Sequence, residues 1–249
     1  VLYRIFKTND FGVGLFPNPP VPFFLNVPII LTIPDMAFFY DKEMYWWVKS
    51  YLWVIYYLSA HKAAVVVTFS QNSKKDIKKI LNLKSEKIII VPLAPSRTIQ
   101  PINDKEKISL VQKRYRIDKT YILSVPGTFV PRKNIVGLIK AFASLPKEIK
   151  NKLQLVIVGK IQGIGYDKAK SLSVKLGVDK EVIFTDRVDD EELSCLYSGT
   201  KIFVCPSLYE GFGLPLLEAM KCGIPVIAYD NSSLPEIVGD AGILVKDSD

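Results

Sequence analysis

Short apolar runs alternate with polar, helix-like segments along the second half of the chain. The apolar runs occupy residues 121–125, 153–159, 182–185, 201–205 and 225–229. Segments with a helical spacing of apolar residues lie between and after them, at residues 135–145, 167–176, 190–197, 214–220 and 234–238. Strands that alternate with helices form parallel sheets with helices on both faces, so this pattern predicts a doubly wound α/β domain.

The first half follows the same pattern less regularly. Continuous β-branched runs predict three buried parallel strands, at residues 27–33, 65–70 and 87–93. A polar helix is expected over residues 74–83, with Asn72 or Ser73 as its cap. The four prolines of residues 16–22 predict a loop, because proline lacks a backbone donor. A linker and a second polar helix are expected between residues 94 and 118.

The chain length of 249 residues allows two domains, each with its own core. We predict a first domain over residues 1–105 and a second over residues 106–249. The chain begins with Val1 rather than methionine and ends at Asp249, just after an apolar run. We therefore expect a chain that is truncated at both ends.

The segment 44–58, MYWWVKSYLWVIYYL, is rich in tryptophan and tyrosine. It falls short of the roughly 20 apolar residues that span a bilayer. Aromatic residues of this kind favour the membrane–water interface, which suggests lipid contact. The other interpretation is a core helix of the first domain, and both can hold for different faces of one helix.

The net charge of +8 comes entirely from the first half of the chain. Residues 1–118 hold 17 basic and 9 acidic side chains, whereas residues 119–249 hold 16 of each. A basic face can attract nucleic acid, an anionic membrane surface or a phosphorylated acceptor. The lysines of residues 74–79 can equally be a solvated helix face. Without a recognised nucleic-acid motif, we expect no nucleic-acid partner.

The spacing of the cysteines and the single histidine argue against a metal cluster. Cys195, Cys205 and Cys222 show no C-x-x-C spacing, and His61 is the only histidine of the sequence. No metal site and no cofactor are therefore expected. A reducing, cytoplasmic compartment is the simplest one, and the start of the sequence shows no secretory signal.

A glycine-bearing loop between the run 201–205 and the helix 214–220 concentrates the candidate chemistry. Pro215 suits a first helical turn, and Gly223 suits the position just past a helix end. The N–H groups near residues 212–214 are then helix-start donors that favour an anion. Gly211 and Gly213 keep side chains out of that approach.

Two carboxylates flank this loop. Glu210 lies just before the helix, and Glu218 lies in its second turn. A carboxylate that accepts hydrogen bonds from two hydroxyls is a directional reader of sugars. Anion donors with a carboxylate at each end fit a sugar that is joined to a phosphate.

A second loop, residues 127–134 with the sequence GTFVPRKN, follows the run 121–125. Its cations Arg132 and Lys133 are disfavoured by the dipole at a helix start, which indicates a phosphate role rather than simple solvation. A third loop, residues 159–165, is neither a dinucleotide motif nor a P-loop. It argues against a nicotinamide enzyme and against an NTPase.

These segments together resemble the retaining glycosyltransferases of the GT-B fold, glycosyltransferase family four. The resemblance rests on EGFGLPLLE at 210–218, with seven residues between the glutamates, on 127–134, on GIPVIA at 223–228 and on SSLPE at 232–236. It covers most of the chain and is strongest from residue 121 to the end. It implies an α/β fold of two Rossmann-like doubly wound domains that face each other across a cleft.

The resemblance also implies roles for individual residues. The catalytic residues would be Glu210, which contacts the sugar hydroxyls, Lys133 and Arg132, which bind the donor diphosphate, and Asp35. The donor-binding residues would be Gly127, Val188, Gly211, Phe212, Gly213, Leu214 and Glu218, with Glu218 on the ribose and Val188 near the nucleobase. The family commonly has glycine at the position of Asp186, so this turn does not predict which nucleobase the donor carries.

One position departs from the family. Asp35 matches a usual His-Asp pair, but Pro34 stands where the family has the histidine. A mechanism that uses this histidine does not carry over to this chain. For Asp35, a cap of the following segment is an equal alternative to a role in the site.

The resemblance implies a retaining, metal-independent hexosyltransferase of polysaccharide biosynthesis. It would move a sugar from a nucleotide sugar, of the GDP-mannose or UDP-hexose type, to a glycan or lipid-linked acceptor. We expect it in the cytoplasm, peripherally bound to the inner face of the membrane. The alternative is a non-catalytic nucleotide-sugar-binding or membrane-docking protein on the same fold.

Overall fold

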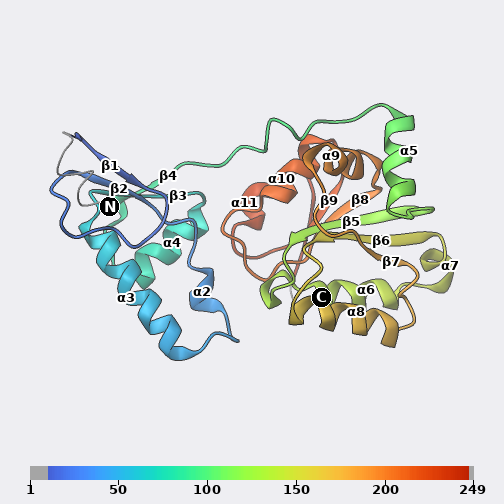
Figure 1. Ribbon diagram of the computed structural model, residues 1–249, viewed down its shortest axis with the longest axis horizontal. Helices are drawn as coiled ribbons and strands as arrows, with labels where there is room; N and C mark the ends of the chain where they lie inside the picture. The colour runs from blue at the N-terminus through green and yellow to red at the C-terminus, as the bar shows by residue number, and fades with distance from the viewer. Residues whose placement is uncertain (1–10, 247–249) are drawn as a thin grey trace. The chain divides into compact units, whose positions relative to one another are not determined.

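The computed structural model describes residues 11–246, which fold into two compact units (Figure 1). One unit holds residues 11–93 together with 210–212, and the other holds residues 94–209 and 213–246. Predictions that concern residues 1–10 and 247–249, including both expected truncations, lie outside the described residues.

The first unit is a four-stranded parallel sheet in the order β1-β2-β3-β4. Its strands are β1 (Gly14–Phe16), β2 (Ile29–Thr32), β3 (Val65–Thr68) and β4 (Ile88–Ile90). Its helices are α2 (Ala37–Tyr40), α3 (Trp46–Lys62), α4 (Gln71–Ile80) and the 3₁₀-helix η1 (Ser85–Lys87). The three predicted strands are confirmed, whereas β1 and the four-residue helix α2 were not predicted.

The cap of α4 corrects one prediction. The helix begins three residues before the expected start, and its cap is Ser70 rather than Asn72 or Ser73. The Ser70 backbone is extended, as a capping residue requires, and its hydroxyl accepts a hydrogen bond from the Ser73 N–H at 3.0 Å. The backbone N–H of Ser73 is therefore the group that the cap satisfies.

The long aromatic helix α3 has two different faces. Trp53, Tyr56 and Tyr57 pack against the core of the first unit, and the Trp53 Nε1–H donates to the Ile80 carbonyl at 3.0 Å. Trp46 and Tyr51 are exposed, at 78% and 64%. The core-helix interpretation is therefore confirmed for one face. Of the helices between residues 11 and 246, none combines the length and the apolar character needed to cross a bilayer.

The second unit is a six-stranded parallel sheet in the order β10-β9-β8-β5-β6-β7. Its strands are β5 (Thr120–Gly127), β6 (Leu153–Gly159), β7 (Val182–Phe184), β8 (Ile202–Cys205), β9 (Val226–Tyr229) and β10 (Ile243–Val245). The helices are α5 (Lys105–Arg114), α6 (Ile135–Ser144), α7 (Lys147–Lys150), α8 (Ile164–Lys175), α9 (Asp190–Gly199), α10 (Leu214–Lys221), α11 (Leu234–Val238) and the 3₁₀-helix η2 (Pro131–Lys133).

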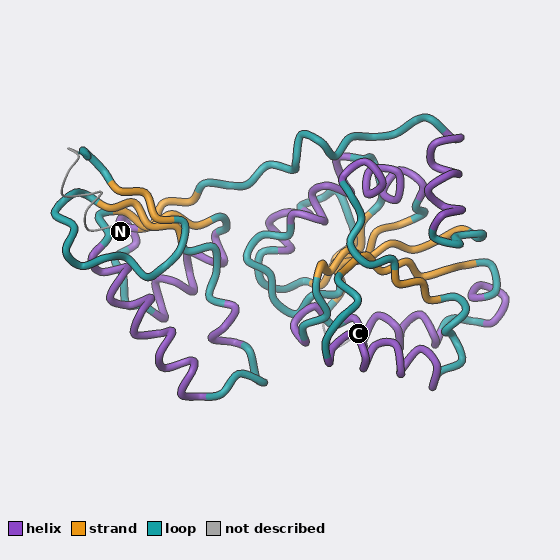
Figure 2. Tube along the Cα trace, in the orientation of Figure 1, coloured by secondary structure: helices purple, strands orange, loops and turns teal. Residues whose placement is uncertain are grey.

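Helices cover both faces of this sheet, as the alternating pattern predicts (Figure 2). Strand β6 shows why, because its successive side chains point to opposite faces. Leu155 and Ile157 belong to the core beneath α6 and α8, whereas Val156 and Val158 belong to the core beneath α9, α10 and α11. The doubly wound architecture is confirmed. Helix α7 and strand β10 were not predicted, and α8 begins earlier than expected, because Gly163 at φ +86° starts it.

The linker between the units is bound along α9. Ser194 Oγ accepts from the Gln100 N–H at 3.3 Å, and Ser198 Oγ accepts from the Ile102 N–H at 2.8 Å. The linker therefore packs with the second unit, and the boundary placed before residue 106 stays a prediction. All three cysteines are reduced and buried.

Candidate functional site

The second sheet has a topological switch point between β5 and β8. These strands are hydrogen-bonded neighbours, with Ile122 opposite Ile202 and Leu123 opposite Phe203. From β5 the chain continues to β6 and β7 on one side, and from β8 it continues to β9 and β10 on the other. Ligands of open α/β sheets bind outside the carboxyl ends of the strands at such a point. The loops that follow β5 and β8 are the two loops that the sequence singled out.

The structure brings these two loops into direct contact. The Leu208 N–H donates to the Arg132 carbonyl at 2.7 Å, and Arg132 Nη1 donates to the Tyr209 carbonyl at 3.1 Å. Lys133, the next residue, is half-buried at the end of η2. Arg132 thus holds the loop after β8 in place. Both cations, Arg132 and Lys133, lie in the loop after β5, at the carboxyl edge of the switch point.

Helix α10 begins at this edge as the glycine and proline positions predict. Gly213 caps it with φ +108°, a left-handed backbone that favours glycine, and Pro215 lies in its first turn. Leu214 is its first residue, and Gly223 follows its end with φ +74°. The first amides of a helix have no carbonyl partner within it, and the dipole adds positive charge there. The start of α10 therefore suits an anion.

Glu218 is half-buried in the second turn of α10, and the Tyr197 hydroxyl donates to its Oε2 at 3.1 Å. Burial raises the pKa of Glu218, because it disfavours the carboxylate, whereas the Tyr197 hydrogen bond opposes this shift. Burial also raises the pKa of Tyr197 well above its usual value, so its hydroxyl is a donor. Sequence reasoning missed Tyr197, because nothing in the sequence of α9 shows where its hydroxyl points.

Glu210, Gly211 and Phe212 are buried and group with the first unit. Within that unit, a Cβ atom on Gly211 would lie 2.4 Å from Asp35 Oδ2, which explains the glycine. Asp35 Oδ1 accepts from the Ala37 N–H at 2.8 Å, at the start of α2. Asp35 thus binds the first amide of α2 from the position before Met36, which is the cap residue of that helix, and its role in the site stays a prediction.

The loops after β5, β6 and β7 also meet at the carboxyl edge. The Gly127 carbonyl accepts from the Lys160 N–H at 3.0 Å, and Gly159 pairs with Asp186 as an isolated bridge. Asp186 has φ +64°, a backbone conformation in which aspartate is tolerated better than most residues. Val188, two residues later, packs partly buried against the core beneath α9. Gly127 and the turn before Val188 therefore belong to one row of loops.

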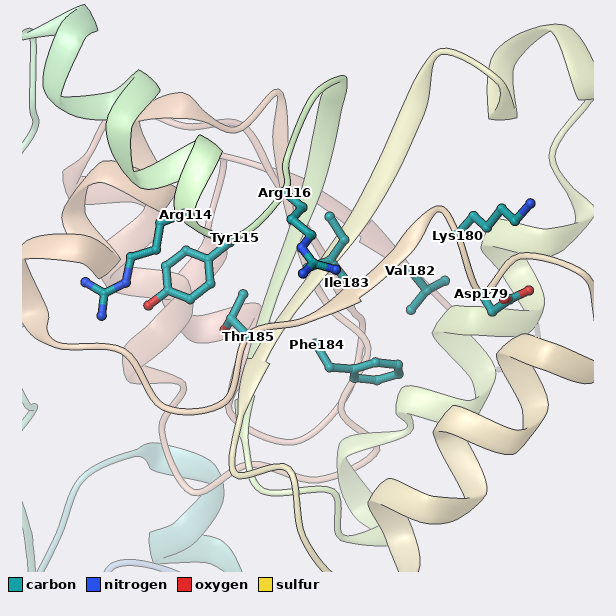
Figure 3. A pocket seen from close by; sticks show the side chains of 9 residues that line it. All are labelled: Arg114, Tyr115, Arg116, Asp179, Lys180, Val182, Ile183, Phe184 and Thr185. Carbon is teal, nitrogen blue, oxygen red and sulfur yellow. The ribbon is translucent and has the colours of Figure 1, made fainter.

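A separate surface hollow of about 520 Å³ lies around the edge strand β7 and the end of α5 (Figure 3). The side chains of Arg114, Tyr115 and Ile183 line it, with none of the predicted site residues among its lining. Arg114 forms an ion pair with Glu192 beside it. Among residues 11–246, no three histidine, cysteine, aspartate or glutamate side chains are arranged to hold a metal ion.

The two parallel sheets, with helices on both faces of the second and cations at its switch point, are those of an α/β protein of the doubly wound class. The chain belongs to the family of group 1 glycosyl transferases, whose family model matches residues 104–249. This membership confirms the resemblance that the motifs carry.

The proteins similar to this chain include one of similar sequence and two of similar structure. O-antigen chain mannosyltransferase B of Escherichia coli is 37% identical over 191 residues, which cover 77% of this chain and 50% of that protein. The chain thus spans half the length of this relative. Sucrose-phosphate synthase from Thermosynechococcus elongatus matches with a TM-score of 0.74 at 23% identity, over 91% of this chain and 56% of that one.

The second similar structure is that of the Anabaena protein Alr3699/HepE, solved in complex with UDP and glucose. It matches with a TM-score of 0.74 at 20% identity, over 88% of this chain and 58% of that one. At this level of identity the two structures show the fold alone. They confirm the GT-B fold.

Proposed function

We propose that the protein to which this chain belongs transfers a hexose from a nucleotide sugar to a glycan or lipid-linked acceptor. The observation that carries the proposal is the contact between the Arg132 loop and the loop that leads into α10, at the switch point of the second sheet. The similarity to an O-antigen mannosyltransferase supports mannose as the sugar and polysaccharide biosynthesis as the setting. The UDP and glucose bound to the Anabaena protein support a nucleotide sugar as the donor.

The reaction breaks the bond between the anomeric carbon and the donor diphosphate. Negative charge then builds on the leaving diphosphate, and the positive charge of Lys133, of Arg132 and of the start of α10 would offset it. The proposal needs no divalent cation, because these groups supply that charge. Glu218 would accept hydrogen bonds from the ribose hydroxyls and Glu210 from the sugar hydroxyls.

The acceptor oxygen forms the new bond to the anomeric carbon, on the face that the diphosphate leaves. Its proton passes to a phosphate oxygen of the leaving group. Because the new bond forms on the face that the diphosphate leaves, the sugar keeps its anomeric configuration. This route does not require the histidine that Pro34 replaces. Pro34 is therefore compatible with an active enzyme. The similarity to an O-antigen mannosyltransferase favours that over a non-catalytic role.

The test uses the full-length protein with GDP-mannose and a panel of UDP-hexoses, and it measures release of the diphosphate. Lys133→Ala should lower kcat/KM by about 100-fold, the usual cost of removing one group that stabilises transition-state charge. Lys140→Ala, on the exposed surface of α6, is the matched control and should stay within about twofold. Absence of release from every donor, or equal rates for the two variants, would overturn the proposal.

The exposed face of α3 supports a peripheral position at the inner, cytoplasmic face of the membrane. Trp46, Trp47, Tyr51, Val54 and Leu58 are all exposed and recur at helical spacing. Tryptophan and tyrosine settle at the membrane interface, and the basic excess of residues 1–118 suits anionic lipid.

Vesicle co-sedimentation tests this position. The full-length protein should bind vesicles of phosphatidylglycerol and phosphatidylcholine better than vesicles of phosphatidylcholine alone. Trp46→Ala with Trp47→Ala should weaken that binding at least about tenfold. Leu110→Ala, which removes an exposed apolar side chain from α5, should not. Equal binding by both variants would remove α3 from the proposal.

A further inference from the structure

Tyr197 of α9 is a fully buried tyrosine whose hydroxyl reaches Glu218. It has no exposed surface, and its ring packs against Phe203 with the centroids 5.7 Å apart. Its hydroxyl lies 3.1 Å from Glu218 Oε2 and 3.2 Å from the Pro215 carbonyl oxygen. The ring is fixed by the core, so the hydroxyl is a fixed point against the first turns of α10.

Both acceptors of this hydroxyl lie on one helix, three residues apart. A single hydroxyl hydrogen is shared between them, so Tyr197 ties the first turn of α10 to the Glu218 carboxylate. Glutamate has three side-chain torsions, and an anchored Oε2 removes most of that freedom. Oε1 is then the oxygen that would accept a hydrogen bond from a ligand.

We propose that Tyr197 is a positioning residue, which orients the Glu218 carboxylate so that it accepts hydrogen bonds from the ribose hydroxyls of a nucleoside diphosphate. The inference rests on the proposed function, because it takes Glu218 as the ribose contact. Tyr197 itself does not touch the donor. Its effect is therefore on recognition of the ribose rather than on the bond that breaks.

The charge on Glu218 depends on several neighbours. Burial is the main cause of its raised pKa, and the hydrogen bond from Tyr197 opposes it; Asp190 at the start of α9 raises the pKa further, and Lys221 at the end of α10 lowers it. Cys222 and Cys205 face the same region, where their proximity adds to the raised pKa of Tyr197. Removal of the Tyr197 hydroxyl therefore raises the pKa of Glu218 further, and ribose recognition would fail at a higher pH.

The experiment compares Tyr197→Phe with Tyr121→Phe in the full-length protein. Tyr121 is the matched control: it is equally buried, and its hydroxyl donates to the Leu196 carbonyl at 2.7 Å, not to Glu218. Calorimetry measures the Kd of GDP and UDP and of their 2′,3′-dideoxy forms. The ratio of the two Kd values reports the contribution of the ribose hydroxyls alone.

In the wild type and in Tyr121→Phe, the dideoxy nucleotide should bind more weakly than the parent by about tenfold or more. In Tyr197→Phe the ratio should fall toward one, and any ribose contribution that remains should be lost at a higher pH than in the wild type. Glu218→Asp keeps the charge but withdraws it from Tyr197 by one methylene, so it should lose the ratio as well. This second variant serves if Tyr197→Phe does not fold.

The outcomes separate the two proposals. If the wild type binds no nucleoside diphosphate, the proposed function is wrong and this inference falls with it. If the wild type reads the ribose, but Tyr197→Phe and Glu218→Asp keep the ratio and pH profile of Tyr121→Phe, the proposed function stands and Tyr197 is only a packing residue.

Discussion

Gly165 lets α8 approach the loop that carries Arg132 and Lys133. A Cβ atom at this position would lie 1.9 Å from the Phe129 carbonyl oxygen and 2.9 Å from its carbonyl carbon. Phe129 cannot yield easily, because it is buried and its ring packs against Tyr166 and Phe184 at centroid distances of 5.4 and 5.8 Å. Gly165→Ala should therefore displace the backbone of the loop.

The size of this displacement follows from the contact. Carbon atoms of side chains do not come within 3.0 Å of such neighbours, so the loop must move by about 1 Å. Overpacking of this kind costs about 1–3 kcal/mol of unfolding free energy. In a chain of this size that cost lowers Tm by about 2–12 °C. A misplacement of about 1 Å near a reacting group lowers the rate by about 100-fold.

The control is Gly177→Ala, just past the other end of α8. Gly177 has φ +64° and open space around it, so alanine there brings backbone strain of about 1–2 kcal/mol without displacing the loop. Calorimetry should give similar Tm losses for both variants, and diphosphate release should fall only in Gly165→Ala. Equal activity of the two variants at equal Tm loss would refute the link between α8 packing and the loop.

Three further predictions concern single side chains. Leu216→Ala removes a fully buried side chain and should cost about 2–5 kcal/mol in urea unfolding, whereas a cost below about 1 kcal/mol would contradict its place in the core. Ser70→Ala removes the cap of α4 and should cost about 1 kcal/mol, against less than about 0.5 kcal/mol for the exposed Ser50→Ala; equal costs would argue against the cap. The folded pKa of Glu218 lies above its usual 4.5, so this group adds stability as the pH falls through the raised pKa toward 4.5. Glu218→Gln should lose that increment in a pH series of Tm while weakening nucleotide binding, and an unchanged pH profile would count against the raised pKa.

Five of the six strands of the second unit, β5 to β9, could be predicted, because helices cover both faces of the sheet. Such strands are continuous apolar runs, and β6, with all but one of its residues buried, is the clearest. The elements that were missed are short. Helices α2 and α7 have four residues each, too few for a helical period, and β1 and β10 have three residues with exposed positions.

The site was predicted in part. The glycine, proline and cation positions of the two loops are local signals, so the start of α10 and the loop with Lys133 could be located from the sequence. The contact of Arg132 with Tyr209 depends on which strands are neighbours, and the reach of Tyr197 to Glu218 depends on how α9 packs on α10. Neither is a property of one segment, so neither could be predicted.

The three buried cysteines make this chain suitable for site-directed labelling. Cys195, Cys205 and Cys222 are at most 9% exposed, and burial raises the pKa of Cys195 and Cys222. Their thiols should react slowly with maleimides, which attack the thiolate. A cysteine introduced at exposed Lys78 and another at exposed Lys175 would take up probes selectively without removal of the native cysteines. Distances between the two units, with and without a nucleotide, can then be measured directly in solution.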